Sequence, residues 1–370
     1  MIAVMASEGL AHDLLRLFPA LDEMSPWLSV PLLGLLGCAL VTGWITVFAL
    51  FAIWLERKVA GHIQCRLGPM EVGPHGLLQT VADGIKLMAK EDVIPRSADR
   101  ILFIVAPVVV FTATFLLFVV LPFDKHVVVA DLNIGVFYLA AIASLEVIGV
   151  IMAGWASNNK WSLFGAMREA TQMVSYEIPL GLALLSVVVV SGTLGFQGIV
   201  ETQSGWFWRW HVFRSPFLAL TFIIYYIAAL AECKRAPFDL PEAESELVSG
   251  FHTEYSSMRF SIFFLAEYAF MFLVCGVATS LWLGGWNTGI PALDGLTGPL
   301  GIMIRTSAML GKSMFLVFLQ IWIRWTYPRI RLDQVMYLCL KVLVPFGFAS
   351  LIGATLWELA FPGRVWFLQI

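Results

Sequence analysis

Long apolar stretches with few charges are the feature of this 370-residue sequence that most limits its fold. A helix needs about 20 consecutive, mostly apolar residues to cross the hydrocarbon layer of a membrane. Such stretches recur along the chain and predict an all-α, polytopic membrane protein of about eight transmembrane helices. The expected spans are 31–55, 101–122, 134–156, 178–200, 216–232, 260–284, 299–323 and 342–362.

The composition agrees with a membrane protein. Hydrophobic residues make up 59% of the chain and charged residues 13%, whereas soluble domains carry about 25% charged residues. So few charges cannot cover the surface of a soluble protein, and so much apolar surface excludes a disordered chain. The net charge is −3 and no basic tract is present, so we expect membrane lipid and no nucleic acid as a partner.

The basic residues indicate which way the chain crosses the membrane. Most of them fall in four loops, 56–100, 157–177, 233–259 and 324–341. Because basic loops remain on the cytoplasmic side, we expect these loops in the cytoplasm and both chain ends on the outer side. No repeat or linker divides the sequence, which predicts one membrane domain over residues 1–370.

The first of these loops contains an amphipathic pattern. Residues 76–90 place an apolar stripe at helical spacing opposite a polar stripe that includes Asp83 and Lys86. Either this helix rests on the lipid surface, or Asp83 and Lys86 face a ligand cavity. Just upstream, Glu56 and Arg57 precede a Gly/Pro-rich bend. Glu56 is either a charge at the end of a span or a side chain that this bend fixes at the membrane surface.

Four charged residues lie in the expected spans or at the edge of one. Glu146, Glu267 and Lys312 are inside spans, and Glu177 directly precedes the fourth span. A charge at the centre of a membrane costs about 2.5–3.5 kcal/mol, so it usually faces a cavity, a partner or a proton path. Each of the four is either part of a buried ion pair or a station for protons, and four of them in one chain favour proton movement.

The third cytoplasmic loop is the richest in acids. Six acids stand among apolar residues at the start of this loop and within it: Glu232, Asp239, Glu242, Glu244, Glu246 and Glu254. Pro237 and Pro241 oppose a continuous helix there. Since acids among apolar groups lose hydration and repel one another, we expect their proton affinities to rise enough for proton exchange near neutral pH.

These segments resemble the family of the H subunit of bacterial NADH–quinone oxidoreductase, respiratory complex I. The segments that carry the resemblance are 56–58, 66–69, 76–91, 157–179, 231–255, 267–268 and 324–334. Two positions depart from the family's usual pattern. Lys234 stands where the family usually has Asn, and Tyr327 stands where a smaller or aliphatic residue is more common.

The resemblance implies a bacterial inner (plasma) membrane protein that is not catalytic alone but belongs to a proton-pumping NADH:quinone oxidoreductase. It implies a ubiquinone or menaquinone headgroup site lined by Glu56, Arg57, Arg66, Asp83 and Lys86. The acids of the third cytoplasmic loop, with Glu146, Glu177, Glu267 and Lys312, would couple this site to proton translocation. The partners implied are the quinone-module subunits of the hydrophilic arm and the small and antiporter-like subunits of the membrane arm.

The implied complex also contains a flavin and iron–sulfur clusters, but the resemblance places them on other subunits. The five cysteines of this chain are scattered and form no C-x-x-C motif. We therefore expect no flavin, iron–sulfur cluster or metal on this chain.

Two other functions remain open from the sequence. The first alternative is a homologous membrane subunit of an energy-converting hydrogenase or formate hydrogenlyase. The second is an autonomous transporter. Transporters often contain inverted repeats, and no repeat is visible here.

Overall fold

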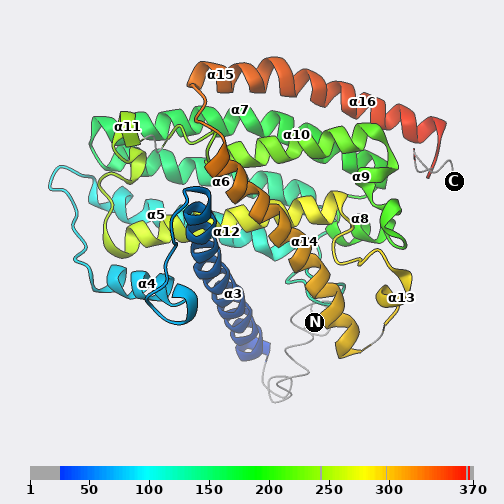
Figure 1. Ribbon diagram of the computed structural model, residues 1–370, viewed down its shortest axis with the longest axis horizontal. Coiled ribbons are helices and arrows are strands. Elements are labelled where there is room, and N and C mark those ends of the chain that lie inside the picture. Colours follow the sequence, from blue (N-terminus) through cyan, green and yellow to red (C-terminus); the bar gives the residue numbers. More distant parts are fainter. Residues whose placement is uncertain (1–25, 242–243, 297, 364–365, 367–370) are drawn as a thin grey trace.

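The computed structural model describes residues 26–241, 244–296, 298–363 and 366, and this part of the chain is helical without strands (Figure 1). The elements before the middle of the chain are α3 Pro26–Ile63, η2 Pro74–Gly76, α4 Gln79–Ala89, α5 Arg100–Leu117, η3 Phe118–Val120, α6 Gly135–Ala156, α7 Lys160–Ser191, α8 Phe196–Thr202, η4 Phe207–Arg209 and α9 His211–Arg214. The remaining elements are α10 Pro216–Glu232, α11 Glu244–Leu247, η5 Gly250–His252, α12 Ser257–Trp282, α13 Pro291–Asp294, α14 Pro299–Thr326, α15 Leu332–Tyr337, η6 Leu338–Leu343 and α16 Val344–Ala360.

Within the described residues, seven helices are long and apolar enough to cross a membrane, which confirms the all-α, polytopic class. They lie in α3, α5, α6, α7, α12, α14 and the continuous stretch Leu332–Ala360. Helix α10 has the bounds expected for the fifth span but only 17 residues. At 1.5 Å per residue it rises about 26 Å, less than the hydrocarbon thickness of about 30 Å.

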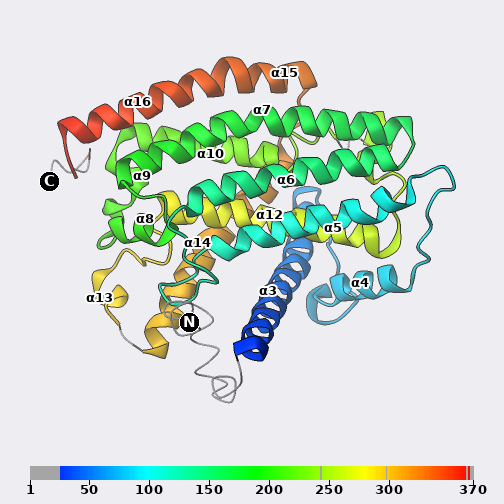
Figure 2. The ribbon, with the colours of Figure 1, turned by 180° about the vertical axis from the view of Figure 1, so that it is seen from behind.

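The helices α5, α6, α7, α10 and α12 lie side by side (Figure 1). Helix α16 packs along α7 and α10, whereas α3 and α14 contact α12 and cross the other helices obliquely, as Figure 2 shows from behind. Every residue from Tyr268 to Trp282 on α12 is buried. A helix that is apolar all round is surrounded by others, and α12 is the packing centre that brings the elements of the site together.

Helix α7 differs most from the expected spans. It begins at Lys160, inside the segment expected to be a loop, and ends at Ser191. The side chain of Asn159 accepts a hydrogen bond from the backbone N–H of Trp161 and caps its start, and Gly192 ends it with a φ of 72°. Hydropathy missed its first half because that half buries polar side chains, among them Glu169 and Gln172.

The amphipathic helix expected over 76–90 is present as α4. Its apolar residues Val81, Ile85 and Met88 are exposed in the isolated chain, and α4 contacts α3 and α12. Among its described residues, the loop 233–259 contains the short helix α11 and the 3-10 turn η5 between α10 and α12 and no other helix. This agrees with the prediction that no continuous helix forms there.

Candidate functional site

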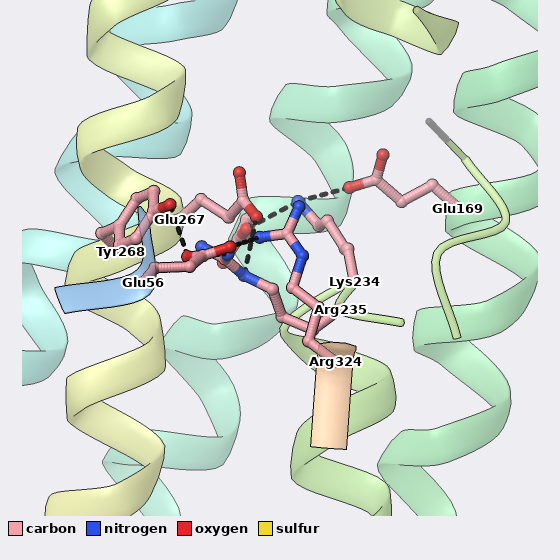
Figure 3. Close-up of polar contacts among 8 residues, drawn as sticks. Glu56, Glu169, Lys234, Arg235, Glu267, Tyr268 and Arg324 are labelled. Atoms are coloured by element: carbon pink, nitrogen blue, oxygen red, sulfur yellow. Dashed lines mark hydrogen bonds and ion pairs between the residues drawn. The ribbon is translucent and has the colours of Figure 1, made fainter. Parts of the chain in front are cut away.

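Glu56, near the C-terminal end of α3, is the centre of a buried ion-pair network. Only 5% of the residue is exposed. Its carboxylate accepts hydrogen bonds from Arg235 Nη1 at 2.9 Å, from Arg324 Nη1 at 2.5 Å and from the Tyr268 hydroxyl at 2.7 Å (Figure 3). Three elements beyond α3 therefore meet at one carboxylate.

Arg235 extends this network to α12. Its Nε lies 3.1 Å from Glu267 Oε1, and its guanidinium carbon lies 4.3 Å from the centre of the Tyr268 ring. Burial by itself lowers the pKa of Arg235, but the carboxylates of Glu267 and Glu56 outweigh that effect and raise it well above its ordinary value. Two arginines and two glutamates balance one another in this group, which we call the Glu56 cluster (Glu56, Arg235, Glu267, Tyr268 and Arg324).

A second buried group surrounds Lys234. Its Nζ lies 2.9 Å from Glu146 Oε1 on α6, contacts Glu169 on α7, and lies 5.5 Å from the centre of the Phe251 ring. Burial lowers the pKa of Lys234, but the charges of Glu146 and Glu169 outweigh burial and raise it above its ordinary value. We call Lys234, Glu146 and Glu169 the Lys234 triad.

The two groups are linked through the backbone, because Lys234 and Arg235 are consecutive residues. They follow the end of α10, and Lys234 has a φ of 56°. Figure 3 shows the two side chains between Glu56 and Tyr268 on one side and Glu169 on the other. The chain leaving α10 thus places one cation in each buried group.

A third group lies between α3 and α4. Arg57 Nη1 is 2.6 Å from Asp83 Oδ2, and Lys86 Nζ is 3.5 Å from Asp83 Oδ1. Partial burial raises the pKa of Asp83, but the hydrogen bond and the charge from Arg57 outweigh it and hold the pKa below its ordinary value of 3.8. Arg66 does not join this group; its Nε donates to Gln64 Oε1 at 2.6 Å.

Glu177 and Glu232 line an interior cavity of about 230 Å³ among apolar side chains of α5, α6, α7, α10 and α12. Glu232 is 4% exposed, and it interacts electrostatically with Glu146, Glu177 and Lys234. A cavity of this size has room for several water molecules between polar groups. Glu232 therefore links this cavity electrostatically to Glu146 and Lys234 of the Lys234 triad.

The other described acids of the loop 233–259 each contact a different partner. Asp239 pairs with Arg329 at 3.1 Å and Glu254 accepts a hydrogen bond from Asn159 at 2.6 Å. Glu246 is largely exposed and pairs with Arg168 at 2.5 Å. The hydrogen bond and charge of Arg168 lower the pKa of Glu246, so the expected rise in proton affinity is wrong for this residue.

Two acids of this loop cannot be placed. Glu242 and the side chain of Glu244 lie outside the described residues.

Lys312 lies apart from all these groups. Its Nζ donates to the carbonyl oxygens of Leu283 and Asn287 at 2.7 and 2.8 Å, and it lies 4.5 Å from the centre of the Trp210 ring. These residues follow the end of α12, at the opposite end of that helix from Ser257. Lys312 fixes the carbonyl groups that end α12.

Sequence reasoning missed the part that Glu169 plays and gave no role to Tyr268 or Arg324. A signal for Glu169 exists. It shares one face of α7 with the buried residues Gln172 and Tyr176 at spacings of three and four residues. An acid on a buried helix face needs a cation, and Lys234 supplies it. Within the described residues no group of three or more His, Cys, Asp and Glu residues could hold a metal ion.

The fold and the site define a polytopic helical membrane protein whose interior holds paired charges. A family model described as NADH dehydrogenase matches residues 36–355.

Curated relatives extend over most of the chain. The H subunit of NADH-quinone oxidoreductase from Chlorobium luteolum is 48% identical over 352 residues, which cover 93% of this chain and 94% of the relative. The H subunits of the same name from Chlorobaculum tepidum and Anaeromyxobacter dehalogenans are 46% and 44% identical, over 92% and 83% of this chain and 98% and 77% of each relative. The chain belongs to the NADH dehydrogenase family.

Proposed function

We propose that this chain helps to form the quinone-headgroup site of NADH-quinone oxidoreductase and couples quinone reduction to proton translocation. Family membership supports a membrane subunit of that oxidoreductase complex, one that is not catalytic alone and that works with other subunits of the complex. The relatives reported above carry the name of this complex, which favours it over a hydrogenase subunit or an autonomous transporter.

The observation that carries the proposal is the adjacency of Glu56 and Arg57. Arg57 turns to Asp83 at the partly exposed surface between α3 and α4, whereas Glu56 turns inward to Arg235 and Arg324. A ligand bound at Arg57 would therefore lie next to the residue that anchors the buried network, Glu56. A change of charge on that ligand would alter the electrostatic potential at Glu56. No other described pair of neighbours joins the surface group to the interior in this way.

Arg57, Asp83 and Lys86 are suited to a quinone headgroup. The headgroup offers carbonyl oxygens that accept hydrogen bonds, and these oxygens gain negative charge on reduction. Arginine and lysine donate to such oxygens, and charge-assisted hydrogen bonds are about twice as strong as neutral ones. Asp83 holds the guanidinium of Arg57 in place for the ligand. Glu56 and Arg66 support the site by fixing α3 and the following bend.

The coupling route that we propose runs from the Glu56 cluster, through the charges of the neighbouring Lys234 triad, to Glu232 and Glu177 at the cavity. Asp239, Glu246 and Glu254, with Glu242 and Glu244, belong to the same loop and are proposed to link the route to the quinone site. Beyond Glu177 the route would continue in the small and antiporter-like subunits. Lys312 is proposed as an outer station, held by the carbonyl oxygens that end α12.

The experiment uses the intact complex in sealed inner-membrane vesicles. With Glu232→Gln and Glu177→Gln we expect NADH-driven proton pumping to fall more than quinone reduction, because a neutral amide cannot carry a proton. Lys125→Gln, which removes an exposed ion pair with Glu201, is the control. Wild-type pumping in both glutamine variants would overturn the proposed function. Tagging the chain ends and the loop at residue 246 tests the proposed orientation, with loops inside and ends outside.

A further inference from the structure

Lys234 is the only described lysine with both a carboxylate of α6 and a carboxylate of α7 at its Nζ. An ammonium group has three N–H donors. Glu146 and Glu169 occupy two directions, and the Phe251 ring lies 5.5 Å away in a third. All three members of the triad are at most 5% exposed, so bulk water does not replace these contacts.

We infer that Lys234 keeps Glu146 and Glu169 ionised during turnover, so that Glu232 and Glu177 are the acids of this region that exchange protons. This inference rests on the proposed function. It divides the acids of the proposed route into those that stay ionised, Glu146 and Glu169, and those that exchange protons, Glu232 and Glu177. A cation within hydrogen-bond distance favours the charged form of a carboxylate. A proton on Glu146 or Glu169 would remove one of the contacts that compensate a buried ammonium, and an uncompensated buried charge is strongly unfavourable.

The charges around the triad support this division. The groups around Lys234 are Glu146 on α6, Glu169 on α7 and Glu232 at the end of α10. His252 of η5 lies against the Phe251 ring, 3.8 Å between the ring centres. The triad itself carries one net negative charge. Glu232 also interacts with Glu177 across the cavity. Proton uptake at Glu232 relieves repulsion without breaking an ion pair.

The backbone conformation at position 234 does not favour lysine, so the contacts of the lysine side chain must stabilise it there. Lys234 has a φ of 56°, a left-handed conformation that most side chains disfavour and that Asn tolerates best after Gly. The contacts with Glu146 and Glu169 offset this backbone preference. Lys234→Asn, which introduces the residue that the resembling family usually has, therefore suits the local backbone and removes the ammonium group from Glu146 and Glu169.

The test compares Lys234→Asn with Lys234→Arg in the intact complex in sealed vesicles, with Lys125→Asn as an exposed control. Without the cation, the two adjacent carboxylates share a proton. We expect the acid limb of the pH profile of proton pumping to move up by about one pH unit or more in Lys234→Asn. The limb should stay in place in Lys234→Arg and in the control. Lys234→Met also lacks the cation and is assayed in parallel. We expect the same upward shift of the acid limb in this variant, which replaces Lys234→Asn if the asparagine variant assembles poorly.

A second readout is the protonated-carboxyl band in the infrared spectrum of the purified complex. Lys234→Asn should gain such a band at neutral pH, and Lys234→Arg should not. An unshifted acid limb and an unchanged band would overturn the inference, even if the amount of assembled complex falls, because that result shows a structural role alone.

The glutamine variants separate the two proposals. If Glu232→Gln and Glu177→Gln stop pumping while Lys234→Asn leaves the limb unshifted, only this inference fails. If the two glutamine variants pump at the wild-type rate, the proposed function itself fails.

Discussion

Glu56 and Arg57 are consecutive on α3, yet their side chains bond to different parts of the protein. Glu56 accepts from Arg235 and Arg324 in the interior, and Arg57 donates to Asp83 on α4 at 2.6 Å. Successive side chains of a helix point about 100° apart, so one turn of α3 serves two groups. This geometry places the surface group and the Glu56 cluster within one residue of each other.

Glu56→Gln should destabilise the protein strongly. It leaves Arg235 and Arg324 with less compensation in a buried place, and breaking a buried ion pair costs about 3–5 kcal/mol. We expect a lower thermal midpoint of the purified complex and less assembled complex. Glu201→Gln, which breaks the exposed pair with Lys125, should change stability by less than about 1 kcal/mol. Equal midpoints for the two variants would contradict the structural importance of Glu56.

Asp83→Asn should weaken quinone binding more than turnover. The variant removes the carboxylate that orients Arg57, and a hydrogen bond to a charged group contributes about 1.5 kcal/mol or more. We expect the KM for a soluble quinone to rise about tenfold, with a smaller change in kcat. Asp92→Asn is the matched control. The Asp92 carboxylate lies 3.0 Å from Arg259, and neither residue pairs with Arg57, Asp83 or Lys86. A KM unchanged in Asp83→Asn would exclude this residue from the site.

The contribution of Asp83 should not depend on pH in the neutral range. Its folded-state pKa lies below its ordinary value of 3.8, so the pair with Arg57 is present above that value and is lost as the pH falls through the lower folded pKa. We expect wild-type and Asp83→Asn pH profiles of quinone reduction to differ in height and not in shape near neutrality. A change in the acid limb between the two would show that Asp83 titrates in the working range.

Gly76→Ala should disturb the bend that leads into α4. Gly76 has a φ of 73°, and an added Cβ would lie 2.2 Å from the Pro69 carbonyl oxygen. The substitution should destabilise the bend by more than about 1 kcal/mol. Gly84→Ala is the matched control, since a Cβ there meets nothing within 4 Å, and alanine in a helix gains about 0.5–1 kcal/mol. Hydrogen exchange of the α4 amides should rise in the first variant and fall in the second.

Much of the fold followed from local pattern. Apolar stretches predicted the polytopic helical class and the bounds of α10. The opposed stripes of residues 76–90 predicted α4. Hydropathy failed at the first half of α7, because that part of the helix buries Glu169 and other polar side chains against neighbours that a local window does not contain.

The sequence by itself determined which residues carry charge among apolar neighbours, because that cost is local and is visible in any window of the chain. Only the tertiary structure decided which charges compensate one another. Lys234 meets Glu146 from 88 positions away, and Arg324 meets Glu56 from 268 positions away. Ion pairing depends on distance in space. That distance is set by how α3, α6, α7, α12 and α14 pack, and no sequence spacing encodes it.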